Sequence, residues 1–181
     1  DGSSRHLYDA AFDLFSCTKP VVAAIQGAAV GGGLGVACFA DFRIAAPEAR
    51  FTANFARLGF HHGFGLTATL PSLVGQQKAL ELLYTGARIK GEEAVDIGLA
   101  DRLVPLAELR SAAHELATEI ATSAPLAVES IRETMRGHLP QAIKAATDRE
   151  KVEQDRLRTT DDWKEGVAAM NERRTPDFSR K

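Results

Sequence analysis

Residues Lys19 to Asp41 read KPVVAAIQGAAVGGGLGVACFAD. The first half of this stretch is a short apolar run bounded by Pro20 and Gly27, which predicts a strand buried on both faces. Three consecutive glycines at 31–33 follow, and small or apolar residues then continue to Asp41 without a helix breaker. The expected order of elements is therefore a strand, a glycine turn and a buried helix.

The glycine turn is a candidate site for a negatively charged oxygen. Glycine lets a ligand approach the backbone closely, and the first N–H groups of a helix have no acceptor within it. These N–H groups lie at the positive end of the helix dipole, which suits a phosphate or a developing oxyanion. Tight packing of the helix on the strand is the alternative explanation. Two nucleotide-binding patterns are excluded, because Val36 and Cys38 break the G-x-G-x-x-G spacing and no Lys-Ser or Lys-Thr pair follows the glycines.

Further motifs extend along most of the chain. FRIAA occupies 42–46, LLYTG occupies 82–86, AVDIGLA occupies 94–100 and DDWKEGVAA occupies 161–169. Together with the pattern of 19–41, these segments resemble the signature of the enoyl-CoA hydratase/isomerase (crotonase) superfamily. The resemblance covers about residues 18–178. It implies an α/β fold, in which a stacked ββα spiral core is followed by a C-terminal α-helical layer that mediates trimerisation.

The sequence pattern divides the chain into two regions. Residues 1–104 alternate helix and strand signals, and the resemblance identifies them as part of the spiral core. Residues 105–181 contain only amphipathic helix signals, and in the resembled family such a region builds a homotrimer or a dimer of trimers. That family also has a further N-terminal section with a second oxyanion donor and much of the CoA pocket, so we expect this chain to be the C-terminal two thirds of a longer protein. The other expected strands are 42–46, 50–53 and 100–104. The expected helices are 5–16, 63–70, 76–84, 91–97, 106–122, 125–136, 141–159 and 161–174. We expect a helix break near Pro71, a helix end at Gly86 and an N-terminal cap at Asp161.

Composition argues against some classes of function. The chain has 181 residues with 45% hydrophobic content, enough for a core, and its net charge of −2 gives no attraction to nucleic acid or to a membrane. No apolar run is long enough to span a bilayer. Cys17 and Cys38 are far apart in apolar surroundings, which predicts reduced thiols in a cytoplasmic protein.

The resemblance also places two neutral residues where hydratases of the family have glutamates. One glutamate lies two residues after the triple glycine, which is Gly35 here, and the other lies four residues before Gly59, which is Phe55. Hydration of a double bond needs a base that activates water and an acid that protonates the α-carbon. Gly35 and Phe55 supply neither group, so we expect hydration to be very slow or absent.

An oxyanion device and a histidine pair remain as candidate catalytic elements. The resemblance implies that the N–H of Gly32 points at the thioester carbonyl oxygen. His61 and His62 lie in a loop that borders the acyl pocket in the resembled family, and neutral histidine suits acid–base work; an ordinary surface role is the alternative. No third ligand stands at a useful spacing, so no metal site is expected, and coenzyme A enters only as part of the substrate. The expected substrate-binding residues are Ala29, Val30, Gly31, Gly33, Asn54, Phe55, Leu58 and Gly63.

Three functions remain open from the sequence. The first is an acyl-CoA enzyme that works through an enolate or a tetrahedral oxyanion, as an isomerase, a decarboxylase or a thioester hydrolase. The second is an acyl-CoA enzyme whose acid–base residue lies in the N-terminal section. The third is a catalytically inactive protein for CoA binding or oligomer assembly. The expected small-molecule partner is an acyl-CoA thioester.

Overall fold

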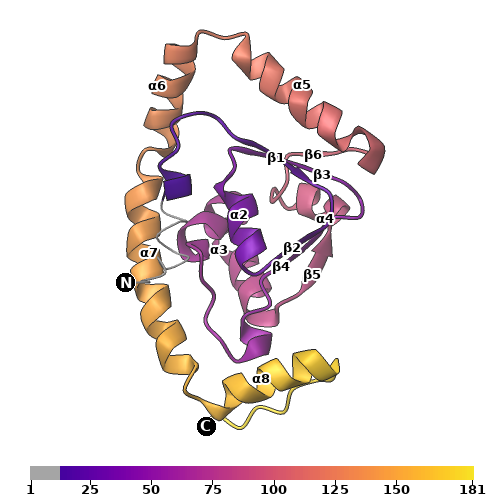
Figure 1. Cartoon of the computed structure of the whole chain (residues 1–181), viewed down its shortest axis with the longest axis vertical. Helices are drawn as coiled ribbons and strands as arrows, with labels where there is room; N and C mark the ends of the chain where they lie inside the picture. Colours follow the sequence, from indigo (N-terminus) through magenta and orange to yellow (C-terminus); the bar gives the residue numbers. More distant parts are fainter. Residues whose placement is uncertain (1–12) are drawn as a thin grey trace, which may run out of the picture.

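The computed structural model describes residues 13–181. Short strands alternate with helices up to residue 103, and only helical elements follow from there to residue 181 (Figure 1). The elements are β1 (Val22–Ile25), β2 (Ala28–Val30), α2 (Gly32–Phe39), β3 (Phe42–Ala45), β4 (Arg50–Thr52), η1 (Ala56–Leu58), α3 (Leu66–Thr85), β5 (Arg88–Lys90), α4 (Gly91–Asp96), β6 (Arg102–Leu103), η2 (Leu106–Glu108), α5 (Leu109–Ala121), α6 (Pro125–Arg136), α7 (Leu139–Leu157) and α8 (Asp161–Glu172).

The strands of the described residues form two three-stranded sheets. In the first sheet β3 lies between β1 and β6 and is parallel to both, with Ala24 of β1 paired to Ile44 of β3. In the second sheet β4 lies between β2 and β5, parallel to β2 and antiparallel to β5. Because β1 and β2 belong to different sheets, the chain leaves one sheet and enters the other at residues 26–27.

The strand predicted between Pro20 and Gly27 is present as β1, but the prediction that it is buried on both faces is wrong, because Ala24 is exposed and its other residues are only partly buried. The expectation that this strand leads directly into the glycine turn is also wrong, because a second strand follows it. β1 ends at Ile25, and β2 lies between it and the glycine turn. β2 has only three residues, and its partner β4 is distant in sequence, so no local periodicity marks it. The crossing between the sheets is fixed by Gly27, whose carbonyl oxygen accepts a hydrogen bond from the Arg50 N–H at 2.9 Å.

Helix α2 is buried, as predicted. Its residues Leu34 and Cys38 pack with Phe51 of β4 and Leu66 of α3 in the main hydrophobic core, and each of the four is 2% exposed or less. Burial of this apolar surface is the main force that holds the helix against the sheet. The core therefore fixes the axis of α2 and the direction of its first N–H groups.

Helix α3 does not break near Pro71, and that prediction is wrong. The helix continues through Pro71, and its break falls at Gly75, which has φ 76° and ψ 158°. Glycine adopts a positive φ at little steric cost, so the chain changes direction there. Gly86 ends the helix in the left-handed conformation, as predicted.

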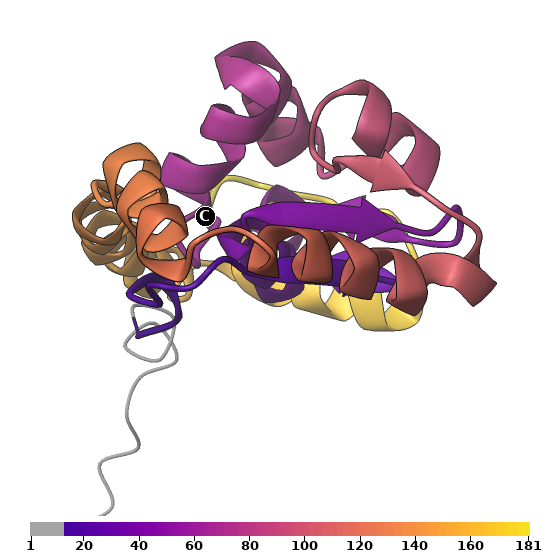
Figure 2. The same cartoon turned by 90° about the horizontal axis from the view of Figure 1, so that it is seen from above.

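The C-terminal helices run along the outside of the strand-rich region (Figures 1 and 2). Helix α5 packs on β1, α7 packs on α3, and α8 packs on η1. The predicted bounds of α6 are confirmed, and α5 is preceded by the short η2 turn. The predicted cap of α8 is wrong by one residue: the Thr160 Oγ1 accepts a hydrogen bond from the Trp163 N–H at 3.2 Å, and Asp161 is already helical.

The predicted helix 5–16 falls mostly outside the described residues, and its described end at 13–15 is helical. Within residues 13–181, none of the helices combines the length and the apolar character that crossing a bilayer requires.

Candidate functional site

The glycine turn at the start of α2 leaves two backbone donors free. Gly31 has φ 54° and ψ −115°, a conformation that favours glycine, and its N–H donates to the Thr52 carbonyl at 3.0 Å. Its carbonyl accepts the N–H groups of Leu34 and Gly35 at 3.0 and 3.2 Å. Within residues 13–181, the N–H groups of Gly32 and Gly33 have no hydrogen-bond acceptor. These two groups are available to a ligand oxygen at the positive end of the helix.

Aromatic side chains border this turn on two sides. A β-carbon built at Gly31 would lie 3.6 Å from Cζ of Phe55 and 3.7 Å from Oδ1 of Asn54. One built at Gly32 would lie 3.9 Å from Cδ2 of Phe64. The turn is therefore enclosed by Phe55 and Asn54 from the segment after β4 and by Phe64 from the loop before α3.

A cavity of about 530 Å³ opens beside Asn54. Its walls come from the ends of β2 and β4, the start of β5 and helix α8. Two arginine side chains contribute to it, and none of its lining residues is acidic, so the cavity carries net positive charge. Its lining residues are Val30, Thr52, Asn54, Arg57, Gly86, Arg88 and Met170.

His61 and His62 stack on one another with ring centroids 4.2 Å apart and an angle of 25° between the planes. The Nδ1 of His61 lies 2.7 Å from the carbonyl oxygen of His62, and the Nε2 of His62 lies 2.8 Å from the Oγ1 of Thr67. Burial, and next the charge of His61, lower the pKa of His62 to about 4. The imidazole of His62 is therefore neutral at pH 7.

The histidine loop is fastened to α7 by two buried polar side chains. The carboxylate of Glu150, which is 0% exposed, accepts hydrogen bonds from the Gly65 N–H at 2.9 Å and from the Thr67 N–H at 3.0 Å. It also accepts the Thr67 hydroxyl at 2.7 Å. Gln154, one turn further along α7, donates to the His61 carbonyl at 3.0 Å. The position of the loop thus depends on a helix more than 80 residues away in sequence.

Glu150 and Gln154 are not among the residues predicted for the site. A signal for them was present, because both lie on the face of α7 that also buries Ile143 and Ala146, at a helical spacing. A polar residue on such a stripe is buried with a partner or not buried at all. The identity of the partner loop is not encoded in that spacing.

The predicted site residues fall into two groups. Gly31, Gly32 and Gly33 lie at the helix start, with Asn54 and Phe55 beside Gly31. His61 and His62 form the second group, in which the two rings stack on each other. Phe64, two residues after His62, borders the position of Gly32. The remaining predicted residues contribute backbone, core or cavity wall: Ala29 is 5% exposed in the main core, Val30 lines the cavity, Leu58 packs against Gly166 of α8, and Gly63 is buried before Phe64.

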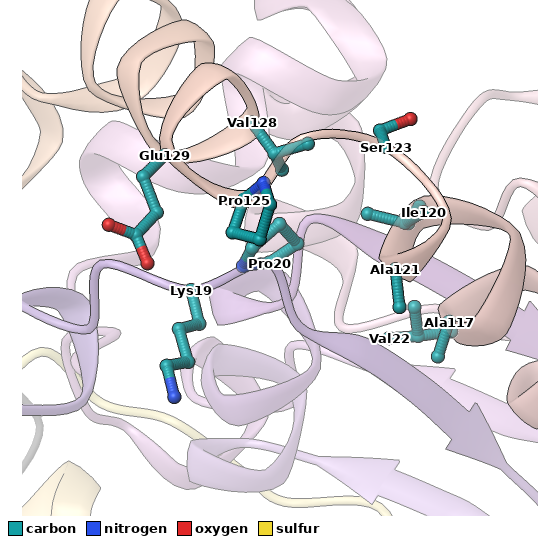
Figure 3. Close-up of a pocket in the computed structure, with 10 residues that line it drawn as sticks. All are labelled: Lys19, Pro20, Val22, Ala117, Ile120, Ala121, Ser123, Pro125, Val128 and Glu129. Atoms are coloured by element: carbon teal, nitrogen blue, oxygen red, sulfur yellow. The ribbon is translucent and has the colours of Figure 1, made fainter.

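A second cavity contains none of the predicted site residues. It has a volume of about 250 Å³ and lies between the start of β1 and helices α5 and α6 (Figure 3). Its walls are mainly apolar, with Pro20 and Val22 facing Ile120 and Val128, and its charged members are Lys19 and Glu129. Throughout residues 13–181, this cavity included, no three His, Cys, Asp or Glu side chains lie close enough together to hold a metal ion.

Comparisons with known proteins identify the family to which the chain belongs. The sequence profile described as enoyl-CoA hydratase/isomerase matches residues 1–181. A short-chain-enoyl-CoA hydratase of Clostridium acetobutylicum is 37% identical over 156 residues, which are 86% of this chain and 60% of that protein. A carnitinyl-CoA dehydratase of Proteus mirabilis is 36% identical over 170 residues, which are 92% of this chain and 65% of that protein. The chain thus spans less than two thirds of the length of either relative.

A solved structure extends the likeness to the fold. An enoyl-CoA hydratase/isomerase from Pseudoalteromonas atlantica superposes with a TM-score of 0.91 at 28% identity, covering 99% of this chain and 72% of that chain. The predicted crotonase-like α/β fold, with a helical C-terminal region, is confirmed by this superposition.

Proposed function

Because the chain belongs to the enoyl-CoA hydratase/isomerase family, we propose that it binds an acyl-CoA thioester and stabilises the oxyanion that forms at the thioester carbonyl. The observation that carries this proposal is the free N–H of Gly32 at the start of the buried helix α2. A fixed donor of this kind acts on developing negative charge without reorganising, and removal of one such donor typically costs about 10²–10³ in rate.

The reaction that we favour is an isomerisation, decarboxylation or thioester hydrolysis rather than hydration. Support comes from the two positions that the resemblance assigns to the hydratase glutamates. Gly35 has no side chain, and Phe55 packs on the glycine turn and stacks on Phe60 with centroids 6.4 Å apart. Enolate or tetrahedral-oxyanion chemistry still benefits from the Gly32 donor, because it develops negative charge on the same carbonyl oxygen.

His62 is the proposed proton carrier. Its side chain is 19% exposed and its ring is neutral at pH 7, so it starts the reaction able to accept a proton. His61 is the second candidate: its Nδ1 contacts the His62 carbonyl oxygen, and within the described residues its Nε2 stays free. The alternative function is a catalytically inactive CoA-binding or assembly protein, in which the donors remain and no proton carrier operates.

The proposed function is tested by changing one backbone donor. In α2, Gly32 is the first helical residue, a position where proline is common in helices and where it removes the backbone N–H. We expect Gly32→Pro to lower turnover of a responsive acyl-CoA by about 10²–10³. Gly32→Ala keeps the N–H and places its β-carbon in ordinary contact with Phe64, so it should retain turnover.

The substrate for this test comes from a panel of acyl-CoA thioesters that includes β,γ-unsaturated, carboxylated and saturated acyl groups. Equal turnover by Gly32→Pro and Gly32→Ala would contradict the oxyanion role. A protein that binds CoA but turns over no member of the panel would favour the inactive alternative.

We also propose that the chain assembles as a homotrimer or a dimer of trimers through its C-terminal helices. Support comes from α6, which buries no residue within the described chain. Its side chains Leu126, Ile131 and Met135 are 80%, 63% and 68% exposed. Such a row of large apolar groups on one amphipathic helix is typical of a surface that another molecule covers.

A further inference from the structure

Glu150 is a buried carboxylate that the proposed reaction does not use directly. It is 0% exposed on α7, and it accepts two backbone N–H groups from the first turn of α3. Those two bonds satisfy orphan donors of the helix, and a purely structural capping role would need nothing more. The third bond is different, because the Thr67 hydroxyl that donates it also contacts the reactive candidate His62.

The hydrogen count at Thr67 fixes the direction of each bond. A threonine hydroxyl has one proton, and a carboxylate oxygen only accepts. The Thr67 proton therefore goes to Oε1 of Glu150 at 2.7 Å. The remaining contact, between the Thr67 oxygen and Nε2 of His62 at 2.8 Å, then requires Nε2 to carry a proton and donate it.

The ring of His61 is held in the opposite tautomer, with its proton on Nδ1. Nδ1 of His61 lies 2.7 Å from the carbonyl oxygen of His62, and a carbonyl oxygen only accepts, so the proton of His61 is on Nδ1. The loop that carries this carbonyl is itself held by the Gln154 bond to the carbonyl of His61. Two stacked histidines therefore present different free nitrogens, Nε2 in His61 and Nδ1 in His62.

We propose that Glu150 is a positioning residue that acts through Thr67, holding His62 in the Nε2–H tautomer so that its Nδ1 is the nitrogen available to accept a proton from the substrate. Only the statement that Nδ1 accepts a proton from the substrate rests on the proposed function. The tautomers of the two rings follow from the hydrogen bonds of the folded chain alone.

The neutral state of His62 makes the tautomer the relevant variable. Burial, and next the charge of His61, lower the pKa of His62 to about 4, although the Glu150 carboxylate lies 3.9 Å from Nε2. At pH 7 the ring therefore carries one proton, and its location decides which nitrogen works as a base.

The test uses nuclear magnetic resonance of the chain labelled with ¹⁵N in its histidines, at pH 7 and without substrate. We expect His62 to show a protonated Nε2 and an unprotonated Nδ1, and His61 to show the reverse pattern. Thr67→Val should expose the Nε2 proton of His62 to faster exchange and admit the other tautomer, while His61 stays unchanged. Thr67→Ser keeps the hydroxyl and should reproduce the parent spectrum.

Two results would overturn the proposal. One is a proton on Nδ1 of His62 in the parent chain, and the other is a His62 spectrum that Thr67→Val leaves unaltered. Thr67 is exposed, and both N–H bonds to Glu150 survive the substitution, so the variant should fold. Where turnover is measured, Thr67→Val should lower kcat at least tenfold with little change in KM. Unchanged kcat with the expected tautomers would count against the catalytic role of His62 and leave the relay itself intact.

Discussion

The ring of Phe64 fills the space into which a side chain at position 35 would extend. A β-carbon built at Gly35 would lie 2.5 Å from Cδ1 of Phe64, a distance that real β-carbons essentially never show. Phe64 is 4% exposed and has φ 62°, so it is tightly held and has little freedom to withdraw. The absence of a side chain at Gly35 is therefore what allows the ring of Phe64 to occupy this space.

We expect Gly35→Ala to lower the free energy of unfolding by about 1–3 kcal/mol, the usual cost of overpacking a core. In a Phe64→Ala background the same substitution should cost much less, because the obstructing ring is gone. Gly33→Ala is the matched control on the same helix, since its β-carbon meets nothing within 4 Å. Denaturant unfolding of the parent, the two single variants and the double variant measures the coupling, and strict additivity would contradict the contact.

Hydration of crotonyl-CoA should be very slow or absent. Neither Gly35 nor Phe55 can activate water or protonate the α-carbon. Gly35→Glu should not restore hydration, because Phe64 occupies the space that the new side chain needs. Loss of the absorbance of the conjugated thioester measures the reaction, and a rate within tenfold of an ordinary hydratase would show that another residue supplies the missing groups.

His62→Ala should reduce turnover of a responsive acyl-CoA by about 10²–10⁴, the usual contribution of a general acid or base. Its effect on the affinity for CoA should be small. His61→Ala is the matched comparison from the same loop and should reduce turnover less, because it leaves the proposed proton carrier in place. Steady-state kinetics together with calorimetric CoA titration would separate these effects, and full activity of His62→Ala would remove His62 from the mechanism.

The free energy of unfolding should fall as the pH drops from 6.5 toward 4. Over this window unfolded His62, with its ordinary pKa of 6.5, binds a proton that the folded residue, with a pKa of about 4, does not bind. The loss is up to about 3 kcal/mol, with no further contribution from this residue above pH 6.5. His62→Gln should flatten the slope, and a variant of the exposed His114 should not. Equal slopes for the parent and His62→Gln in denaturant titrations would be the contrary result.

Assembly should depend on the exposed side chains of α6. Light scattering at micromolar concentration should give a mass of three or six copies, and Ile131→Glu should lower it by placing charge in the covered apolar surface. Ser130→Glu places the same charge at an adjacent exposed polar position and should leave the mass unchanged. A monomeric parent chain would end the proposal.

Features encoded locally were predictable from the sequence. Within 19–41, the apolar run predicts β1, and the glycines and small residues predict the turn and the buried helix α2, because each of these signals lies within a few residues. The bounds of α6 follow from Pro125 at its first position and from its amphipathic repeat. In contrast, β2 is recognisable only by its pairing with β4. The position of the break in α3 was also not predictable, because both Pro71 and Gly75 can interrupt a helix and only the packed structure shows that Gly75 does so.

The site was predictable in part for the same reason. The free donors of Gly32 and Gly33 are a consequence of helix geometry, so the glycine turn reveals them. The contact between Gly35 and Phe64 joins two segments that share no local signal, and Glu150 meets Gly65 across 85 residues of sequence. Such complementarity is a property of the packed chain and cannot be derived from spacing.

The bonds from Glu150 to the first turn of α3 have a consequence for the order in which the chain acquires structure. The sheets and α2 and α3 are complete by residue 103, so during synthesis they emerge well before α7. Until α7 arrives, Gly65 and Thr67 lack their carboxylate partner and the histidine loop lacks its anchor at Gln154. We expect a nascent chain that stops at residue 137 to hold its core and to lack an ordered histidine loop, so that the reactive loop matures last.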